Sequence, residues 1–305
     1  MPWTADDVPD QTGRTAIVTG GNTGLGFETA LVLASRGAHV VLAVRSLERG
    51  NEAATKLRSL DERALVSVQE LDLGSLESVR RAADAMLETL PAIDLLINNA
   101  GIMTPPRSLT SDGFESQFGT NHLGHFALTG LLLERITETA GSRVVSVSSN
   151  GHRWIDGIRF EDPQWAMRYN RIQAYGQAKL ANLMFIYELQ RRLVGSGTIA
   201  TAAHPGSSNT DLARHMPALV RWSVPLFAPL TTQPPQRAAL PTLRAATDSG
   251  VLGGQYIGPD GLGQLKGNPI VRTSSAVSYD LDQQESLWLM SESLTGIHYP
   301  ALARR

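Results

Sequence analysis

The segment that decides the fold is Thr19-Gly-Gly-Asn-Thr-Gly-Leu-Gly26, which joins a short apolar run to an amphipathic one. Residues 15–19 predict a buried strand, and apolar residues recur at helical spacing from Leu25 until Gly37. A glycine loop that leads into a helix offers free backbone N–H groups and the positive end of the helix dipole to a phosphate. The glycines form the pattern T-G-x-x-x-G-x-G and not G-x-G-x-x-G, and taken alone they are also compatible with a structural turn.

The composition is that of an ordinary globular protein. The chain has 305 residues, of which 42% are apolar, a formal net charge of −2 and no cysteine. These values exclude disulfides and give no basic field for nucleic acid, and no linker divides the chain, so we expect one domain. The first ten residues lack the apolar core of a signal peptide, and the longest apolar stretches, 128–133 and 219–230, are too short to span a membrane. We therefore expect a cytoplasmic protein without an integral membrane segment.

Strands and helices alternate along most of the chain. Strands that are apolar throughout and separated by helices predict a parallel seven-stranded sheet with helices on both faces, which is the doubly wound α/β architecture. In such a sheet ligands bind beyond the carboxyl ends of the strands. The predicted strands are 15–19, 39–44, 65–71, 93–98, 143–148, 198–203 and 255–257, and the predicted helices are 25–37, 46–60, 75–90, 113–139 and 171–194.

Small and polar residues gather at the carboxyl ends of these predicted strands. Each group alone is more typical of a turn or a helix cap than of a site. Six groups at one edge of a sheet indicate a binding site. They are Gly20 to Gly26, Arg45, Asp72, Asn98 to Gly101, Val147 to Ser149, and His204 to Gly206.

Tyr175 and Lys179 carry the strongest indication of catalysis. They lie four residues apart on a predicted helix and therefore share one face. An ammonium next to a phenol favours the phenolate, and a tyrosine pKa near 10 must fall before the group can exchange protons near neutrality. A shift of about 3 units needs about 4 kcal/mol of differential stabilisation. The pattern Y-x-x-x-K is common by chance, so its weight depends on the other motifs.

Six motifs together resemble the short-chain dehydrogenase/reductase family. They are T-G-G-N-T-G-L-G, N-N-A-G, N-H-L-G-H-F, V-V-S-V-S-S, Y-G-Q-A-K and H-P-G-S-S-N-T, in the order and approximate spacing of that family, over about residues 12 to 211. N-H-L-G-H-F and A-Y-G-Q-A-K-L-A-N are similar to the subgroup of retinol dehydrogenases, the WW-domain-containing oxidoreductase and protochlorophyllide reductase. The resemblance implies a Rossmann-type fold and an oxidoreductase that interconverts an alcohol and a ketone or aldehyde by hydride transfer with a nicotinamide cofactor.

The resemblance also implies a role for each matching residue. Tyr175 would be the general acid/base, and Lys179 its electrostatic helper, which also holds the nicotinamide ribose. Ser149 would hydrogen-bond the substrate oxygen, and Asn121 would anchor a water leading to Lys179. The implied cofactor contacts are Gly20, Asn22, Thr23, Gly24, Leu25 and Gly26 at the pyrophosphate, Asp72 and Leu73 at the adenine, Asn99, Ala100 and Gly101 at the ribose, and Pro205, Gly206 and Thr210 at the nicotinamide.

Arg45 indicates which dinucleotide binds. Enzymes that use NAD place an acidic residue at the end of the second strand, where it binds the ribose 2′-hydroxyl. This chain has Arg45 there, with Arg49 one turn later. A guanidinium is complementary to a 2′-phosphate, so we predict NADP(H) as the cofactor. The alternative is a solvated surface arginine without a ligand.

Residues 12–206 are expected to form the cofactor-binding and catalytic core, and the segments after residue 206 are expected to shape the pocket. The resemblance makes 207–235 a substrate lid, and its apolar residues suit a lipophilic alcohol or carbonyl, although a packing helix or a contact surface is an equal alternative. Residues 236–305 are expected to contain a helix, the last strand and a tail. The stretch between Ser149 and Tyr175 is long for the family, and we interpret it as an inserted loop that carries Trp154, Phe160 and Trp165.

The helix after Lys179 is apolar nearly all round, which predicts a homo-oligomer through this helix unless the tail past residue 260 blocks it. His122 and His125 lie three apart without an acidic or sulfur ligand at a metal spacing, so we predict no metal.

Two rival enzyme classes fit the sequence less well. An S-adenosylmethionine methyltransferase would need an acid where Arg45 stands, and an epimerase or dehydratase of this superfamily usually has a larger C-terminal domain. A non-catalytic NADPH-binding sensor or scaffold on the same fold stays open as the alternative.

Overall fold

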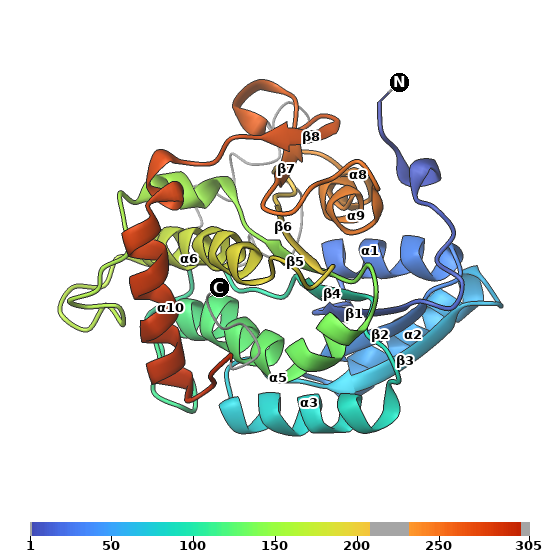
Figure 1. The fold of residues 1–305 in the computed structure, drawn as a ribbon, viewed down its shortest axis with the longest axis horizontal. Coiled ribbons are helices and arrows are strands. Elements are labelled where there is room, and N and C mark those ends of the chain that lie inside the picture. Colours follow the sequence, from blue (N-terminus) through green and yellow to red (C-terminus); the bar gives the residue numbers. More distant parts are fainter. Residues whose placement is uncertain (1, 208–231, 300–305) are drawn as a thin grey trace.

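The structure is a computed structural model that describes residues 2–207 and 232–299. One sheet of eight strands crosses the molecule in the order β3-β2-β1-β4-β5-β6-β7-β8 (Figure 1). The strands from β1 to β7 pair in parallel, and β8 pairs with β7 in antiparallel orientation. The strands are β1 Thr15–Thr19, β2 His39–Val44, β3 Leu65–Glu70, β4 Leu95–Asn98, β5 Arg143–Val147, β6 Ile199–Ala203, β7 Tyr256–Pro259 and β8 Pro269–Arg272.

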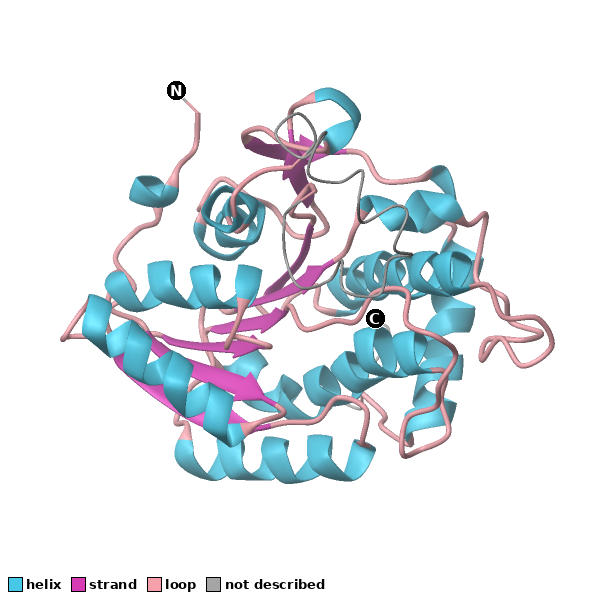
Figure 2. Cartoon of the chain, turned by 180° about the vertical axis from the view of Figure 1, so that it is seen from behind, coloured by secondary structure: helices cyan, strands magenta, loops and turns pink. Residues whose placement is uncertain are grey.

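Helices cover both faces of the sheet (Figures 1 and 2). On one face α3, α5 and α6 share an apolar core with the strands, and α10 packs on α6. On the other face α1, α2 and α9 share a second core with the strands. The helices are α1 Gly24–Ser35, α2 Leu47–Leu60, α3 Leu76–Thr89, α4 Ser116–Phe118, α5 Gly124–Glu138, α6 Arg171–Arg192, α8 Pro235–Ala238, α9 Leu240–Thr247 and α10 Leu281–Thr295.

Local sequence explains where several helices begin. Ser46, Ser75 and Asn170 precede α2, α3 and α6, and each side chain accepts a hydrogen bond from a backbone N–H of the first turn. Such caps satisfy donors that the helix itself cannot pair. Thr23 precedes α1, but its side chain caps no N–H of that helix. The first turn of α1 therefore keeps donors for another acceptor.

The predicted doubly wound α/β fold is confirmed, with one correction to the sheet and one to a helix. The sheet has eight strands, not seven, because Pro269–Arg272 pairs with β7 as a short antiparallel strand. The alternation of strands and helices did not predict this strand, since no long helix separates it from β7. The predicted helix 113–139 is divided into α4, a π-helical turn at Gly119–Leu123, and α5. A π turn inside a helix is a frequent mark of a functional site. The sequence did not predict α10.

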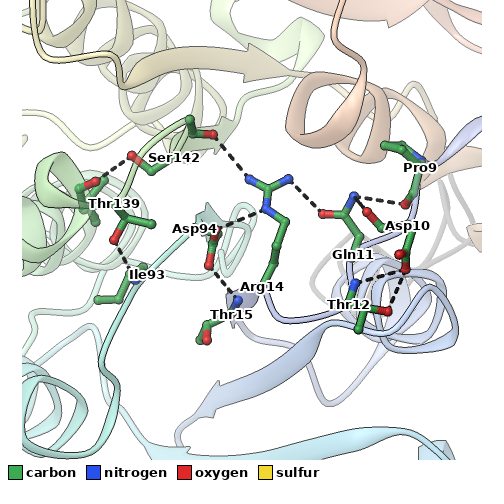
Figure 3. A network of polar contacts seen from close by, with 12 residues as sticks. Pro9, Asp10, Gln11, Thr12, Arg14, Thr15, Ile93, Asp94, Thr139 and Ser142 are labelled. Atoms are coloured by element: carbon green, nitrogen blue, oxygen red, sulfur yellow. Dashed lines mark hydrogen bonds and ion pairs between the residues drawn. The ribbon is translucent and has the colours of Figure 1, made fainter.

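At the amino ends of the strands, a network of side chains ties β1 to β4 (Figure 3). Asp94 accepts hydrogen bonds from the Arg14 Nε at 3.2 Å and from the Thr15 backbone N–H at 2.8 Å. The Arg14 guanidinium also donates to Gln11 Oε1 at 3.0 Å and to the Gly141 carbonyl at 3.3 Å. The polar groups of this edge thus have partners within the chain, which is the pattern of a structural network.

Candidate active site

The strand order brings the sequence motifs to one edge. Strands β1, β4, β5 and β6 are neighbours in the sheet and run in parallel. Their carboxyl ends, Thr19, Asn98, Val147 and Ala203, therefore lie side by side, although they are far apart in the sequence. The segments that follow these ends are the glycine loop, N-N-A-G, V-S-S and H-P-G. The switch point of the sheet, where the sequence predicts a ligand site, thus lies between β1 and β4.

The glycine loop has a backbone that other residues would not tolerate. Gly20 has a φ of 64°, in the left-handed region that favours glycine. A Cβ on Gly26 would lie 2.4 Å from the Gly20 carbonyl oxygen and 2.6 Å from Asn99 Nδ2. The loop is therefore packed tightly against the segment after β4, and it delivers the uncapped N-terminus of α1 to the edge of the sheet. These features fit a dinucleotide pyrophosphate.

Thr19 and Asn99 fix the loop to its neighbour. The Thr19 hydroxyl oxygen accepts hydrogen bonds from the backbone N–H groups of Asn99, at 2.9 Å, and Ala100, at 3.0 Å. Asn99 Nδ2 in turn donates to the Thr19 carbonyl at 2.8 Å. Asn99 thus holds the loop by its side chain, and only its neighbours Ala100 and Gly101 present backbone toward the crevice. Thr19 was not among the predicted site residues.

Ser149, Tyr175 and Lys179 come together beside these loops. Tyr175 and Lys179 are each 4% exposed and lie on the same face of α6. Lys179 Nζ donates to the Val147 carbonyl at 2.9 Å and lies 5.8 Å from the centroid of the Tyr175 ring. The Ser149 side chain lies near enough to the Tyr175 phenol to lower its pKa. The structure therefore brings three of the four predicted catalytic side chains together, with Tyr175 and Lys179 buried and Ser149 half-buried.

Burial dominates the pKa values of this group. It raises the pKa of Tyr175, and the Ser149 side chain only partly opposes this effect. Burial also lowers the pKa of Lys179 to about 8. Desolvation has this effect because both side chains are nearly free of solvent contact. Tyr175 is consequently a neutral phenol, the form that donates a proton.

Asn121 occupies the π-helical turn, and both polar atoms of its side chain bind the backbone of Ile102. Its Oδ1 accepts from the Ile102 backbone N–H at 2.8 Å, and its Nδ2 donates to the Ile102 carbonyl at 2.9 Å. A Cβ on Gly101 would lie 3.2 Å from this Oδ1 and 3.5 Å from Lys179 Nζ. Asn121 thus fastens the segment that lies against the lysine, its backbone carbonyl lies 2.9 Å from His125 Nδ1, and its role in holding a water stays a prediction.

Two buried histidines support the catalytic group, and the sequence did not predict either role. His152 Nδ1 donates to the Ser149 carbonyl at 2.6 Å, while its Nε2 accepts from the Ser275 backbone N–H at 3.1 Å. Burial lowers the pKa of this imidazole to about 4. His125 contacts Asn121 in a similar way. The sequence offered one signal for these roles: His152 is three residues after Ser149, and His125 is four residues after Asn121.

The remaining predicted cofactor residues are distributed along the same edge. Arg45 and Arg49 are exposed, and the Arg45 guanidinium forms no hydrogen bond or ion pair within residues 2–207 and 232–299. Asp72 uses Oδ1 to accept the Gly74 N–H at 2.9 Å. Leu73 lies under the start of α5, since a Cβ on Gly124 would meet its carbonyl at 2.4 Å.

Pro205 and Gly206 follow β6, next to the loop between β7 and β8. A Cβ on Gly206 would lie 2.4 Å from the Leu265 carbonyl, which also accepts the Ser207 N–H at 2.7 Å. Thr210 and most of the predicted lid, 207–235, lie outside the described residues. The division into core, lid and C-terminal part stays a prediction.

The loop between Ser149 and Tyr175 forms a wall of the site. Trp154 is 44% exposed, and its ring centroid lies 6.0 Å from that of Tyr175. Trp165 is buried, with the Arg159 guanidinium stacked on it at 4.3 Å. Trp154 is therefore placed to contact a substrate, whereas Trp165 is part of the packing of the loop.

The helix after Lys179 is covered from within the chain. All residues of α6 from Ala174 to Leu189 are buried. Trp288 of α10 stacks on Phe185 with centroids 5.9 Å apart, and Arg192 lies over the Trp288 ring at 4.2 Å. The predicted homo-oligomer through this helix stays a prediction, which the position of α10 now constrains.

Three of the four ring nitrogens of His122 and His125 are paired within the chain, and His122 Nδ1 has no hydrogen-bond partner among the described residues. His125 pairs both ring nitrogens within the chain, and His122 Nε2 pairs with Ser291 Oγ at 2.9 Å. In the described part of the chain, no three His, Asp or Glu side chains are grouped to hold a metal ion. No helix among the described residues has both the length and the apolar character to cross a membrane.

Comparisons with known proteins define the class. The family model of short chain dehydrogenases matches residues 14–218, and the chain belongs to this family of oxidoreductases. Within it the chain is of the retinol dehydrogenase type: it is 41% identical to human "Retinol dehydrogenase 13" over 301 residues, which cover 95% of this chain and 87% of that protein.

Solved structures agree with this assignment. A putative uncharacterized protein from Mycobacterium Paratuberculosis is 43% identical, with a TM-score of 0.82, and the match covers 98% of this chain and 100% of that one. The Pseudomonas aeruginosa RhlG/NADP active-site complex, at 24% identity and a TM-score of 0.64 over 80% of this chain and 94% of that one, shares the fold. The chain is thus a short-chain dehydrogenase, an enzyme class that interconverts alcohols and carbonyl compounds with a nicotinamide cofactor.

Proposed function

We propose that this enzyme reduces a lipophilic ketone or aldehyde with NADPH, and runs the reverse reaction with NADP⁺, using Tyr175 as the general acid/base. The observation that carries the proposal is the group of the half-buried Ser149 and the buried Tyr175 and Lys179 at the carboxyl end of β5. A buried tyrosine beside a serine hydroxyl, with an amine nearby, fits proton exchange with a carbonyl oxygen.

The chemistry divides between the residues and the cofactor. The bound nicotinamide supplies or accepts the hydride. The Ser149 hydroxyl hydrogen-bonds the substrate oxygen, and the neutral Tyr175 phenol gives it a proton during reduction. Lys179 stabilises the phenolate that is left, because its pKa of about 8 keeps most of it charged at pH 7. Burial of Tyr175 and Lys179 strengthens these interactions by reducing solvent screening.

Cofactor preference rests on Arg45. Its guanidinium is exposed just after β2, at the position where enzymes that use NAD have an acidic residue. Removing a charged partner of the 2′-phosphate and adding a like charge should reverse the preference by about 100-fold, or about 2.7 kcal/mol. Arg45→Asp is compared with Arg63→Asp, an exposed arginine on the turn before β3. An unchanged ratio of kcat/KM with NADPH to kcat/KM with NADH in Arg45→Asp would show that Arg45 does not select the cofactor.

The substrate class rests on the wall of the site. Trp154 is the large apolar side chain nearest the Tyr175 ring among the described aromatic pairs, and the predicted lid contributes further apolar residues by sequence. The test is NADPH oxidation over a panel of aliphatic, aromatic and charged carbonyl compounds. Preference for long aliphatic or aromatic carbonyls would support the proposal, and preference for small charged ones would refute the lipophilic pocket.

The alternative is a protein that binds NADPH without catalysis. It shares every cofactor contact with the enzyme, so binding alone does not separate the two. Measurable turnover that depends on Tyr175 rejects the alternative, and tight NADPH binding without turnover over the whole panel supports it. A cytoplasmic location, expected from the sequence, is part of the proposal and is tested by fractionation of cells that express the full chain.

A further inference from the structure

We propose that His125 is a positioning residue for this reaction: its Nδ1–H holds the Asn121 carbonyl and thereby the turn that lies against Lys179. The inference rests on the proposed function. It concerns a side chain of the motif N-H-L-G-H-F to which the sequence analysis assigned no role in catalysis. His125 is 2% exposed, on the first turn of α5 immediately after the π-helical turn. It touches neither the crevice nor the tyrosine.

The hydrogen bonds of His125 determine which nitrogen carries the proton. Nδ1 lies 2.9 Å from the Asn121 carbonyl oxygen, which can only accept, so Nδ1 is the donor. Nε2 lies 2.9 Å from Thr19 Oγ1. That oxygen already accepts two backbone N–H groups, from Asn99 and Ala100, so its own proton is available for Nε2. The arrangement is fully paired only with a neutral imidazole in the Nδ1–H tautomer.

This tautomer connects the two halves of the site. On one side, Thr19 joins the glycine loop to the segment Asn99–Ala100. On the other side, the Asn121 side chain holds Ile102, whose neighbour Gly101 lies against Lys179. Burial lowers the pKa of His125 to about 4, and the charge of Lys179 acts in the same direction. The imidazole therefore stays neutral through the pH range in which the enzyme would work.

The two contacts can be separated with two amide variants. The Nδ2 of an asparagine takes the position of Nδ1 and can still donate to the Asn121 carbonyl, whereas the polar end of a glutamine takes the position of Nε2 and cannot. In His125→Asn the Thr19 hydroxyl can turn to the Ile97 carbonyl, which lies 3.3 Å away. The proposal therefore predicts that asparagine preserves the function and that glutamine, although closer in size to histidine, does not.

The experiment measures kcat, the KM for the carbonyl substrate, the Kd for NADPH and the melting temperature of both variants and the wild type. We expect His125→Gln to lower kcat about tenfold, as for one lost hydrogen bond that leaves a buried acceptor unpaired. His125→Asn should stay within about threefold of the wild type, with melting temperatures of the two variants alike. Equal losses of kcat in both variants, or a larger loss in His125→Asn, would overturn the proposal.

A second measurement needs no variant and no turnover. Long-range ¹H–¹⁵N NMR of the unliganded wild type reports the tautomer of each histidine. A neutral Nδ1–H form of His125 at pH 7 and at pH 5.5 is the expected result, and an Nε2–H or doubly protonated form would overturn the proposal. If the wild type binds NADPH but reduces no carbonyl, the proposed function fails while the tautomer still tests the structural part of the inference.

Discussion

The two edges of the sheet carry polar residues for different purposes. At the amino edge, Arg14, Asp94 and Gln11 bind each other and the backbone, and their polar groups face partners within the chain (Figure 3). At the carboxyl edge, Tyr175 and Lys179 are also buried, yet Lys179 has donors beyond the one that the Val147 carbonyl accepts. Polarity at the end of a strand therefore does not identify a site, whereas unused donors held in place by buried partners do.

The strongest test of this contrast is Tyr175→Phe. Removing the proton donor should lower kcat about 1,000-fold, because a positioned acid contributes about 10² to 10⁴. The Kd for NADPH and the melting temperature should change little. Tyr256→Phe is the matched control: Tyr256 is also buried, and its hydroxyl has no hydrogen-bond partner within the described residues. Similar kcat values for the two variants would show that the carboxyl edge is not catalytic in this way.

The stability of the unliganded protein should report the unpaired charge of Lys179. Its pKa is about 8 in the folded protein, below its ordinary value of 10.5. Between these values the unfolded chain binds more protons, so stability rises with pH. From pH 8 to pH 9, below the ordinary tyrosine pKa of about 10, the free energy of unfolding should rise by about 1 kcal/mol.

The comparison for this test is Lys179→Met, which has no such proton to lose. Its free energy of unfolding should lack the rise between pH 8 and pH 9 that the wild type shows. Chemical denaturation at pH 7, 8, 8.5 and 9 measures both proteins. A rise of the same size in Lys179→Met would assign the effect to other groups.

At the amino edge, Asp94→Ala should affect stability and not catalysis. The change leaves the Thr15 N–H and the Arg14 guanidinium without their acceptor, at a cost of about 2 kcal/mol. Asp94→Asn keeps an acceptor and should cost less. Urea denaturation and kcat/KM are measured on both. A loss of kcat/KM at a temperature where Asp94→Ala is folded would break the contrast between the edges.

The smallest expected effect is that of Trp154→Ala. The exposed ring beside Tyr175 offers apolar surface to a substrate, so its loss should raise the KM for a bulky carbonyl about threefold to fivefold, or about 1 kcal/mol. Its KM for a small carbonyl should not change. Met167→Ala, which alters another exposed apolar residue of the same loop, serves as the control. Equal changes for large and small carbonyls would remove Trp154 from the substrate wall.

The sequence predicted what depends on neighbours in the chain. Tyr175 and Lys179 are four residues apart, and the glycine loop and the seven parallel strands follow from local periodicity and turn residues. It could not predict contacts between distant residues. His152 is held by Ser275, 123 positions later, and α10 covers α6 through an aromatic stack from Trp288 to Phe185. The burial that raises the pKa of Tyr175 is likewise a property of the whole fold.

The central claim is that Tyr175 delivers a proton while the cofactor delivers hydride to the same carbonyl. The direct measurement uses NADPH dideuterated at nicotinamide C4, one carbonyl substrate found by the panel, and mass spectrometry of the alcohol product. The wild type should place one deuterium on the carbinol carbon, and Tyr175→Phe should form about 1,000-fold less labelled alcohol in the same time. An unlabelled product from the wild type, or equal label from both proteins, would contradict the claim.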